Sequence, residues 1–241
     1  MTSSKVALIV GSSSKLGRFL VKDLARDHKL ILHYNKGYER IKGLLCDEAV
    51  KKNVLKVIQA DLLKERIDNF VSKVLNGLDH LNLMIILSSI YDETPLEMMN
   101  HETIENVIRL NLTVSTSLTL LIGRLMKMWG GGLIIVFTDL IGMRSVNPYT
   151  GLKPSIPYIV SKAGLTTLIR FSAKYLAPVR VVGIAPGWID LPEVGEKLRS
   201  LAVKTIPLRR FARPEEVIHV VRFVMSNEYI NGVIIELSGG L

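Results

Sequence analysis

The sequence predicts an α/β fold in which seven parallel strands form a doubly wound sheet with helices on both faces. Short runs of aliphatic and β-branched residues alternate with longer segments of helical periodicity along the whole chain. Such alternation is typical of βα units, whose right-handed crossovers leave successive strands parallel. With 241 residues and 48% hydrophobic composition, the chain can bury one large core. We therefore expect a single domain that spans residues 1–241.

The strands are expected at residues 5–10, 29–34, 54–59, 81–88, 132–138, 179–184 and 232–237. Two long helices are expected over Val114–Met128 and Tyr158–Tyr175, and a run of three glycines ends the first of them before the fifth strand. The carboxyl ends of parallel strands meet at one edge of a sheet. We expect the functional site at this edge, which collects Gly11, Ser88, Asp139 and Pro186.

The first strand runs directly into the turn Gly11-Ser12-Ser13-Ser14-Lys15-Leu16-Gly17 and then into an amphipathic helix. A pyrophosphate needs backbone N–H donors, the positive end of a helix and side chains small enough to let it approach. Gly11 and Gly17 supply the outer glycines, and Lys15 supplies a cation where a middle glycine is usual. The turn favours a nucleotide-binding site, although this motif alone is equally consistent with an ordinary strand-to-helix loop.

The second strand is followed by Asn35 and Lys36, with no Asp or Glu to accept hydrogen bonds from the adenosine ribose of NAD. Lys36, together with Lys15 or Arg18, can neutralise the 2′-phosphate of NADP, so the sequence favours NADP(H). The alternative for Lys36 is a solvated loop lysine. After the third strand, Asp61 can accept a hydrogen bond from the adenine amino group, cap the next helix, or do both.

Tyr158 and Lys162 are four residues apart at the expected start of a helix. Four residues make about one helical turn, so the two side chains share a face on which an ammonium can stabilise a phenolate. Asp139 precedes this pair at the end of the fifth strand. Together the three side chains indicate proton-transfer chemistry, although a Tyr and a Lys at this spacing also occur by chance on solvated helices.

The whole chain resembles the short-chain dehydrogenase/reductase family, and the resemblance implies a single-domain Rossmann fold. It rests on the glycine turn, Asn111 in the long fourth helix, Tyr158-x-x-x-Lys162, Pro186-Gly187, the segment Pro207–Val217, and the segment Tyr229–Gly240. Two positions depart from the family pattern. Ile86-Leu87-Ser88-Ser89 replaces an Asn-Asn-Ala-Gly or Asn-Asn-Ala-Ser segment, and Asp139 replaces the usual catalytic serine.

The pteridine reductases form one branch of the family that is expected to carry these substitutions, with an Asp for the serine and a basic residue in the glycine turn. In that resemblance the ring of Tyr91 stacks on the flat pterin. The alternative is that Tyr91 lies at the rim of the site and contacts no ligand. Asp139 then has three possible roles: a carboxylate that accepts from a pterin or relays a proton through Tyr158, a protonated donor to a ketone, or a non-catalytic cap.

The resemblance implies four catalytic residues: Asn111, Asp139, Tyr158 and Lys162. It assigns NADP(H) to Gly11, Ser13, Lys15, Leu16, Gly17, His33, Tyr34, Asn35, Lys36, Asp61, Leu62, Ser88, Ser89, Tyr158, Lys162, Pro186, Gly187 and Ile189. It assigns the small-molecule substrate to Tyr91, Asp139 and Trp188, where core packing is the alternative for Trp188. No metal is expected. The predicted activity is hydride transfer from NADPH, with Tyr158 as the proton donor, to a pterin; the alternatives are a carbonyl or 3-oxoacyl-thioester reductase and a catalytically silent NADP(H) sensor.

Two segments are expected to border the substrate. Residues 188–213 have helical character and no clear strand, so we expect a lid there. Met143–Pro157 is rich in proline and is either a lip over the substrate or a surface insertion. The lid ends in a dense group of Arg209, Arg210 and Arg213, which can attract an anionic substrate tail, form a subunit contact or stay solvated.

The remaining basic residues behind the net charge of +9 are scattered, without the stripe of cations and aromatics that nucleic-acid grooves require. The longest apolar stretch is interrupted by polar and charged residues, so we expect no membrane partner and no signal peptide. The single cysteine, Cys46, excludes an intramolecular disulfide and fits a reducing cytoplasm. The family resemblance implies a homotetramer joined through a four-helix interface.

Overall fold

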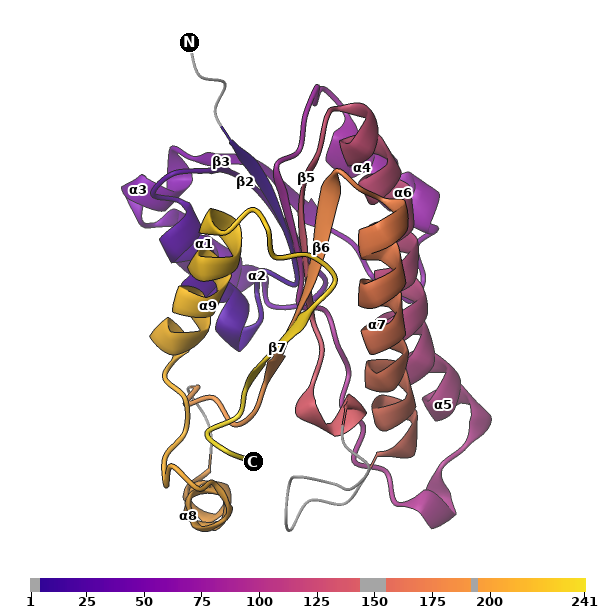
Figure 1. Cartoon of the computed structure of the whole chain (residues 1–241), viewed down its shortest axis with the longest axis vertical. Helices are drawn as coiled ribbons and strands as arrows, with labels where there is room; N and C mark the ends of the chain where they lie inside the picture. The colour runs from indigo at the N-terminus through magenta and orange to yellow at the C-terminus, as the bar shows by residue number, and fades with distance from the viewer. Residues whose placement is uncertain (1–4, 144–154, 192–194) are drawn as a thin grey trace.

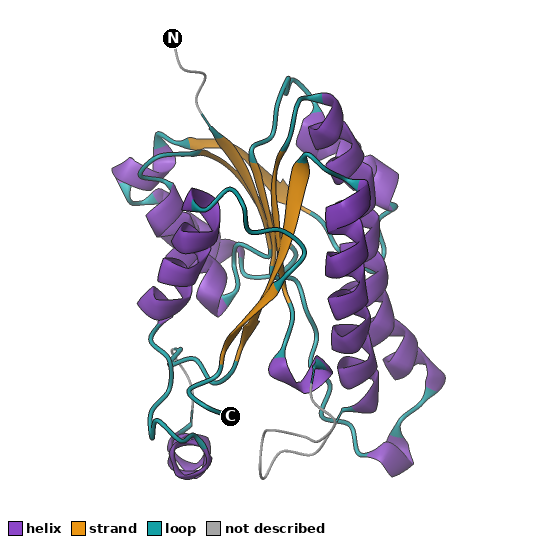
Figure 2. Ribbon diagram, viewed as in Figure 1, coloured by secondary structure: helices purple, strands orange, loops and turns teal. Residues whose placement is uncertain are grey.

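The computed structural model describes residues 5–143, 155–191 and 195–241 of the chain. One parallel sheet lies between two layers of helices (Figures 1 and 2). Its strands are β1 (Val6–Val10), β2 (Lys29–Tyr34), β3 (Val54–Gln59), β4 (Leu83–Ile86), β5 (Gly132–Phe137), β6 (Val179–Pro186) and β7 (Ile234–Leu237). They are arranged in the order β3-β2-β1-β4-β5-β6-β7. The predicted doubly wound sheet of seven parallel strands is confirmed.

The strand boundaries differ from the sequence prediction mainly at β4 and β7, which are both shorter than expected, and at β6, which extends two residues further, to Pro186. At β7 the reason is local. Gly232 has a φ of 71°, outside the extended region, so the strand begins only after it. The preceding Asn231 uses its side-chain oxygen to accept a hydrogen bond from the N–H of Val181 in β6, at 2.8 Å. This side-chain contact adds to the backbone hydrogen bond of 2.9 Å from Gly232 N–H to the carbonyl oxygen of Val181.

The helices are α1 (Lys15–Leu24), α2 (Tyr38–Leu45), α3 (Glu48–Lys51), α4 (Ile67–Leu75), α5 (His101–Ile108), α6 (Ser115–Met128), α7 (Ile156–Tyr175), α8 (Glu196–Thr205) and α9 (Pro214–Ser226). Helices α1, α2 and α9 cover one face of the sheet, and α4, α6 and α7 cover the other (Figure 1). The described residues also form three short helical turns: η1 (Leu96–Met98), the π-helical η2 (Arg109–Val114) and η3 (Leu140–Gly142).

Successive residues of each central strand enter different cores. In β1, Leu8 and Val10 pack toward α4, α6 and α7, whereas Ala7 and Ile9 pack toward α1 and α9. All four side chains are fully buried. Burial on both faces explains why this strand reads as a continuous apolar run rather than as an alternating pattern. Each large aliphatic side chain buried in this way contributes about 1.5–3 kcal/mol to folding.

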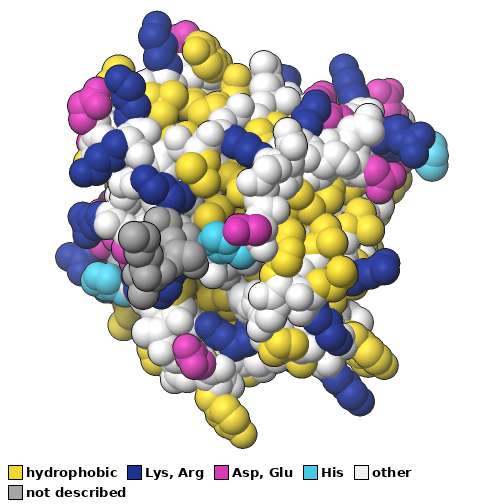
Figure 3. Space-filling model, turned by 90° about the horizontal axis from the view of Figure 1, so that it is seen from above, with side chains coloured by type: hydrophobic (Ala, Val, Ile, Leu, Met, Phe, Trp, Pro, Cys, Tyr) yellow, Lys and Arg dark blue, Asp and Glu magenta, His cyan; other side chains and the backbone are white. Residues whose placement is uncertain are grey.

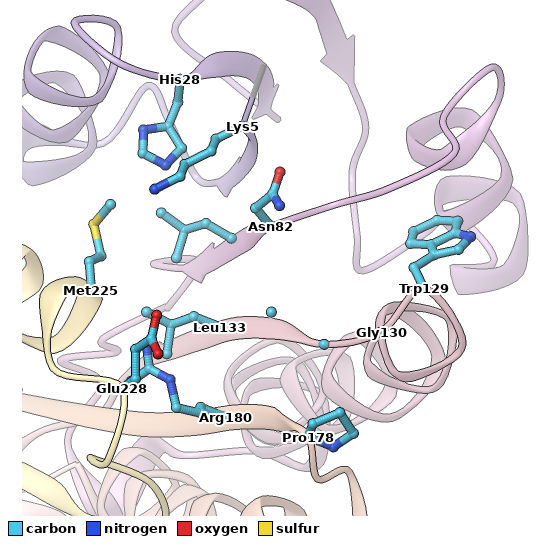
Figure 4. A pocket seen from close by; sticks show the side chains of 13 residues that line it. Lys5, His28, Asn82, Trp129, Gly130, Leu133, Pro178, Arg180, Met225 and Glu228 are labelled. Carbon is cyan, nitrogen blue, oxygen red and sulfur yellow. The ribbon is translucent and has the colours of Figure 1, made fainter. Parts of the chain in front are cut away.

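The two edges of the sheet differ. At the carboxyl edge, the lower edge in Figure 1, lie the glycine turn, η3 and the first residues of α7. At the opposite, amino edge a pocket of about 530 Å³ is bordered by Lys5, His28, Asn82, Trp129 and Arg180 (Figure 4). Figure 3 views the molecule from this side, where Lys and Arg side chains are spread round the perimeter among acidic and apolar ones.

Within the described ranges, no helix combines the length and the apolar character that crossing a membrane requires. The same residues contain no group of three His, Cys, Asp or Glu side chains placed to hold a metal ion. Cys46, at the end of α2, is a free and exposed thiol.

Candidate active site

The glycine turn after β1 leaves no room for side chains at its two outer positions. Gly11 has a φ of 91°, and a Cβ on Gly17 would lie 2.6 Å from the carbonyl oxygen of Gly11. Ser14 then caps α1, since its Oγ accepts the N–H of Gly17 at 3.0 Å. The turn therefore brings backbone and the N-terminal N–H groups of α1 to one surface, which fits a pyrophosphate.

His33, predicted as a cofactor residue, lies underneath this turn. Its ring is 3% exposed; Nδ1 accepts the N–H of Gly11 at 3.2 Å, and Nε2 lies 3.1 Å from the carbonyl oxygen of Ala60. Burial lowers the pKa of His33 to about 4, so the neutral ring with its proton on Nε2 satisfies both contacts. The side chain of the neighbouring Tyr34 is also buried in the core. The His33 ring supports the turn from below.

The loop after β2 is tied to the same turn. Ser13 Oγ donates to the carbonyl oxygen of Lys36 at 2.8 Å, and the side chains of Asn35 and Lys36 are exposed beside it. Nearby on α1, the Nε atom of Arg18 is buried and has no hydrogen-bond partner among the described residues. Leu16, by contrast, points into the core. The cationic groups of this region therefore fit an anion beside the turn.

The expectation that Asp61 caps the next helix is wrong. Helix α4 begins at Ile67, and Arg66 occupies its N-cap position. Asp61 instead closes the turn after β3, because its Oδ1 accepts the N–H of Leu63 at 3.1 Å. Leu62 is 2% exposed and belongs to the core. The carboxylate of Asp61 remains half-buried at the carboxyl edge of the sheet.

The segment after β4 packs directly against the glycine turn. A Cβ on Gly11 would approach the backbone nitrogen of Ser88 to 3.2 Å. The Oγ of Ser88 is buried without a hydrogen-bond partner among the described residues, whereas Ser89 is exposed. An unsatisfied buried hydroxyl beside the glycine turn fits a polar ligand, since such groups are otherwise costly.

Pro186, Gly187 and Ile189 close the other side of this edge. Gly187 N–H donates to the carbonyl oxygen of Leu237 at 2.9 Å, which joins the ends of β6 and β7. Ile189 pairs with Ala212 in an isolated parallel bridge. The bridge ties together the two ends of the expected lid, of which the structure describes 188–191 and 195–213 with α8 between them.

Asp139, Tyr158 and Lys162 lie together at the carboxyl end of β5. The Tyr158 hydroxyl donates to Asp139 Oδ2 at 2.7 Å, and Asp139 Oδ1 accepts the N–H of Ile141 at 3.0 Å, which caps η3. Lys162 Nζ lies 5.3 Å from the centre of the Tyr158 ring and donates to the carbonyl oxygen of Phe137 at 3.2 Å. Burial lowers the pKa of Lys162 to about 8, and the negative charge of Asp139 opposes that decrease. This arrangement can hold and move a proton.

Asn111 joins the site to the segment after β4. Its Oδ1 accepts the N–H of Ile90 at 2.7 Å, and its Nδ2 donates to the carbonyl oxygen of Ile90 and to Ser161 Oγ. The side chain is fully buried. Asn111 lies in the π-helical turn η2 rather than inside a regular helix as expected, and such turns are frequent at functional sites.

Several residues that the sequence interpretation gave no role hold these groups in place. Ser161 Oγ donates to the carbonyl oxygen of Tyr158 at 2.7 Å, and Thr138 Oγ1 donates to that of Lys162 at 3.1 Å. Gly142 allows η3 to touch α7, since a Cβ there would lie 2.5 Å from the carbonyl carbon of Lys162. The glycine three positions after Asp139 was the available signal for this close contact.

Two aromatic side chains border the site. The ring of Tyr91 meets that of Tyr158 edge to face, with centres 4.9 Å apart, and remains 38% exposed. Trp188 packs on the same apolar cluster as Tyr158 and stacks on Phe211 with ring centres 5.7 Å apart. Most of the expected lip over Met143–Pro157 lies outside the described residues.

Comparison with known proteins agrees with this arrangement. A family profile described as "Enoyl-(Acyl carrier protein) reductase" matches residues 16–241. The 3-oxoacyl-(acyl-carrier-protein) reductase of Thermotoga maritima is 29% identical and that of Aquifex aeolicus 30% identical, each over 98% of this chain and 97% of its own length.

Solved structures share the fold over nearly the whole chain. A putative short-chain alcohol dehydrogenase from Sinorhizobium meliloti superposes with a TM-score of 0.85 at 23% identity, over 99% of this chain and 96% of its own. A structure described as ElxO with NADP bound gives a TM-score of 0.84 at 18% identity, over 98% of both chains. The chain therefore belongs to the short-chain dehydrogenase/reductase family of NAD(P)-dependent oxidoreductases.

Proposed function

We propose that this protein is an NADPH-dependent reductase of a small carbonyl compound, with 3-oxoacyl thioesters as the first substrate class to consider. The observation that carries the proposal is the contact between Tyr158, Asp139 and Lys162 beside the glycine turn. The substrate class is supported by the relatives from Thermotoga maritima and Aquifex aeolicus, which are named for the reduction of 3-oxoacyl groups.

In this proposal Tyr158 gives its hydroxyl proton to the oxygen of the substrate carbonyl. Lys162 carries an ammonium at pH values below about 8 and stabilises the phenolate that remains. Asn111 keeps α7 in register with the segment after β4, through its contacts with Ile90 and Ser161. When bound, the nicotinamide cofactor supplies the hydride.

The preference for NADPH follows from the charges around the glycine turn. Lys36 is exposed directly after Asn35, where an NAD-binding enzyme would carry an acid, and Arg18 presents a buried Nε atom without a described partner. A 2′-phosphate would meet cations here rather than a carboxylate. NADPH should therefore be used with a KM at least about tenfold lower than that of NADH, which is about 1.4 kcal/mol of preference.

Asp139 supports a second candidate, the reduction of a dihydropterin. Its Oδ2 accepts the Tyr158 proton and its Oδ1 accepts a backbone N–H, so an ionised Asp139 has no donor to offer a ketone oxygen. A pterin brings its own N–H donors, which a carboxylate can accept. Tyr91 adds a partly exposed ring beside Tyr158 on which a flat heterocycle could stack.

A substrate panel with purified protein separates these candidates. NADPH oxidation is followed with a 3-oxoacyl thioester, a simple ketone, an enoyl thioester, a quinone, a dihydropterin and a biopterin, with NADH in parallel. The same panel is repeated with Asp139→Ser, which restores a hydroxyl donor, and with Asp79→Ser, an exposed acid before β4 and far from the catalytic group, as the control.

Turnover of the 3-oxoacyl thioester that increases in Asp139→Ser would support carbonyl reduction. Pterin-selective turnover that is lost in Asp139→Ser would support the second candidate and overturn the first. Tight NADPH binding without turnover of any carbonyl compound would count against both and favour a protein that only senses NADP(H).

We propose in addition that the chain forms a homotetramer. One exposed apolar surface runs along α7 and includes Val160, Phe171 and Tyr175, which are 52%, 61% and 67% exposed. A second is formed by Phe223 of α9 and Val233 before β7. Two self-complementary surfaces of this kind, each paired about its own two-fold axis, generate a tetramer with D2 symmetry.

A further inference from the structure

A second pocket, of about 380 Å³, lies beyond the carboxyl end of β6 against α8. Its lining residues are Asp190, Arg199, Val203, Arg209, Arg210, Phe211 and Arg213. Four of these seven carry a guanidinium group and one carries a carboxylate. We call this the arginine pocket.

The cations of the arginine pocket are only partly neutralised. Arg199 pairs with Asp190 at 2.7 Å, and Arg210 makes two contacts of 2.7 Å with Glu216, which also lies 3.8 Å from Arg213. Glu196, in the first turn of α8, adds a weaker attraction to Arg199. Arg209 donates to the backbone carbonyl oxygen of Lys204 at 2.6 Å and has no described carboxylate partner. The pocket therefore keeps an excess of positive charge.

The backbone at Arg209 is unusual. Its φ of 55° lies in the left-handed region, and Arg209 is the one non-glycine residue with such a value in the described part of the chain. Glycine adopts this conformation readily, whereas an L side chain is disfavoured there. The turn is held by a hydrogen bond of 2.8 Å from Arg209 N–H to the carbonyl oxygen of Ile206. Glycine would adopt this conformation without strain, so the presence of an arginine indicates that its guanidinium group has a function.

The arginine pocket is joined to the candidate active site by stacked side chains. The Arg199 guanidinium lies 5.4 Å from the centre of the Phe211 ring, and Phe211 stacks on Trp188 at 5.7 Å. Trp188 packs on the apolar cluster that also contacts Tyr158. A substrate that extends from Tyr158 past Trp188 would bring its far end to the arginines.

We propose that the arginine pocket binds the phosphate-bearing end of a thioester substrate whose carbonyl group is reduced beside Tyr158. This inference rests on the proposed function, which it makes more specific. Guanidinium groups bind phosphate oxygens through paired N–H donors, and an open pocket with excess positive charge favours an anion on a flexible arm. Arg209 is then a residue that determines specificity for phosphate-bearing substrates.

The test compares two thioesters with the same 3-oxoacyl group. One is the coenzyme A thioester, which carries phosphates, and the other is the N-acetylcysteamine thioester, which carries none. Arg209→Gly removes the guanidinium and also relieves the backbone strain, so this variant is expected to fold at least as well as the wild type. Arg26→Gln, an exposed arginine at the end of α1, is the control for the general loss of one surface charge.

We expect wild-type protein to prefer the coenzyme A thioester through a lower KM, and Arg209→Gly to reduce this preference about tenfold while Arg26→Gln leaves it unchanged. An equal preference in wild type and Arg209→Gly would overturn the inference while leaving the carbonyl reductase proposal intact.

Binding of free coenzyme A, measured by titration calorimetry at two salt concentrations, gives a readout that needs no turnover. Binding that weakens about tenfold in Arg209→Gly supports the pocket even if the reductase proposal fails, and binding that does not change contradicts it.

Discussion

Tyr158 and Asp139 share a hydrogen bond in which the phenol is the donor, and this direction limits what the site can do. For Tyr158 to protonate a substrate, its hydroxyl must turn away from the carboxylate, which then needs another donor. A substrate N–H group can be that donor. Alternatively, Asp139 is itself protonated, and its carboxyl group then needs no donor. In the proposed mechanism the identity of residue 139 therefore decides which substrates suit the site, whereas Tyr158 and Lys162 deliver the proton.

Lys162 predicts how activity depends on pH. Burial lowers the pKa of Lys162 to about 8, so its ammonium is present below that pH and is lost as the pH increases through it. With saturating cofactor, kcat for reduction should be highest near neutral pH and should decrease above about pH 8. Lys162→Met should lose about 100-fold or more in kcat and the alkaline decrease with it. Lys174→Met, an exposed residue on the same helix, should keep the wild-type profile, and a wild-type kcat that stays constant up to pH 10 would contradict the assignment.

At the scale of elements, the glycine turn is held in place by β2. The ring of His33 connects the N–H of Gly11 to the carbonyl oxygen of Ala60, and the hydroxyls of Ser12 and Ser13 donate to carbonyl oxygens at the end of β2 and just after it. The turn is therefore preorganised by contacts with residues 21 to 23 positions away in the sequence. A cofactor that binds there does not have to order it.

His33 predicts a loss of stability in mild acid. Its pKa is about 4 in the folded chain against an ordinary value of 6.5, so the unfolded chain takes up the proton first as the pH is lowered. The free energy of unfolding should decrease between about pH 6.5 and pH 4, by up to about 3 kcal/mol from this residue. Urea unfolding across this range measures this decrease.

Two variants separate His33 from other groups. His33→Gln should be less stable at pH 7.5 but should show a weaker dependence of stability on pH. His219→Gln, which replaces an exposed histidine on α9, should behave as wild type. Identical pH slopes in all three proteins would contradict this role.

The elements differ in how well they could be predicted from the sequence. The strands and the carboxyl-edge location of the site could be predicted, because the apolar runs and the glycine turn are local signals. The π-helical turn at Asn111 could not, since it depends on contacts with Ile90 and Ser161 that only the fold creates. The same holds for the ring of His33 beneath Gly11, and for Asp61, whose turn ends before α4 begins.

At the scale of the whole molecule, one sheet edge carries the glycine turn, the proposed catalytic group and the proposed lid (Figure 1). Exposed apolar side chains lie along α7 and around β7, and others, such as Leu208, lie in the proposed lid. In the proposed tetramer the surfaces that pair are those along α7 and around β7. The two ends of the proposed lid are joined at its base by the pairing of Ile189 with Ala212.

Phe171 predicts the state of association. The side chain is 61% exposed in the middle of the apolar surface of α7, and a charge there would be buried in the proposed interface. Light scattering with size-exclusion chromatography should give a mass four times that of the chain for the wild type and half of that value for Phe171→Glu. Leu55→Glu, on the edge strand β3, should remain tetrameric. A wild-type protein that is monomeric at micromolar concentration would contradict the assembly.

The Tyr158 hydroxyl is proposed to deliver the proton, and Tyr158→Phe tests this role most directly because the substitution removes one oxygen atom and leaves the ring. The measurement is kcat with the best substrate of the panel, alongside the Kd of NADPH from its fluorescence. We predict a loss of about 100-fold or more in kcat, with the Kd of NADPH unchanged within about a factor of two. Turnover within a few-fold of wild type would show that another group delivers the proton and would contradict the account.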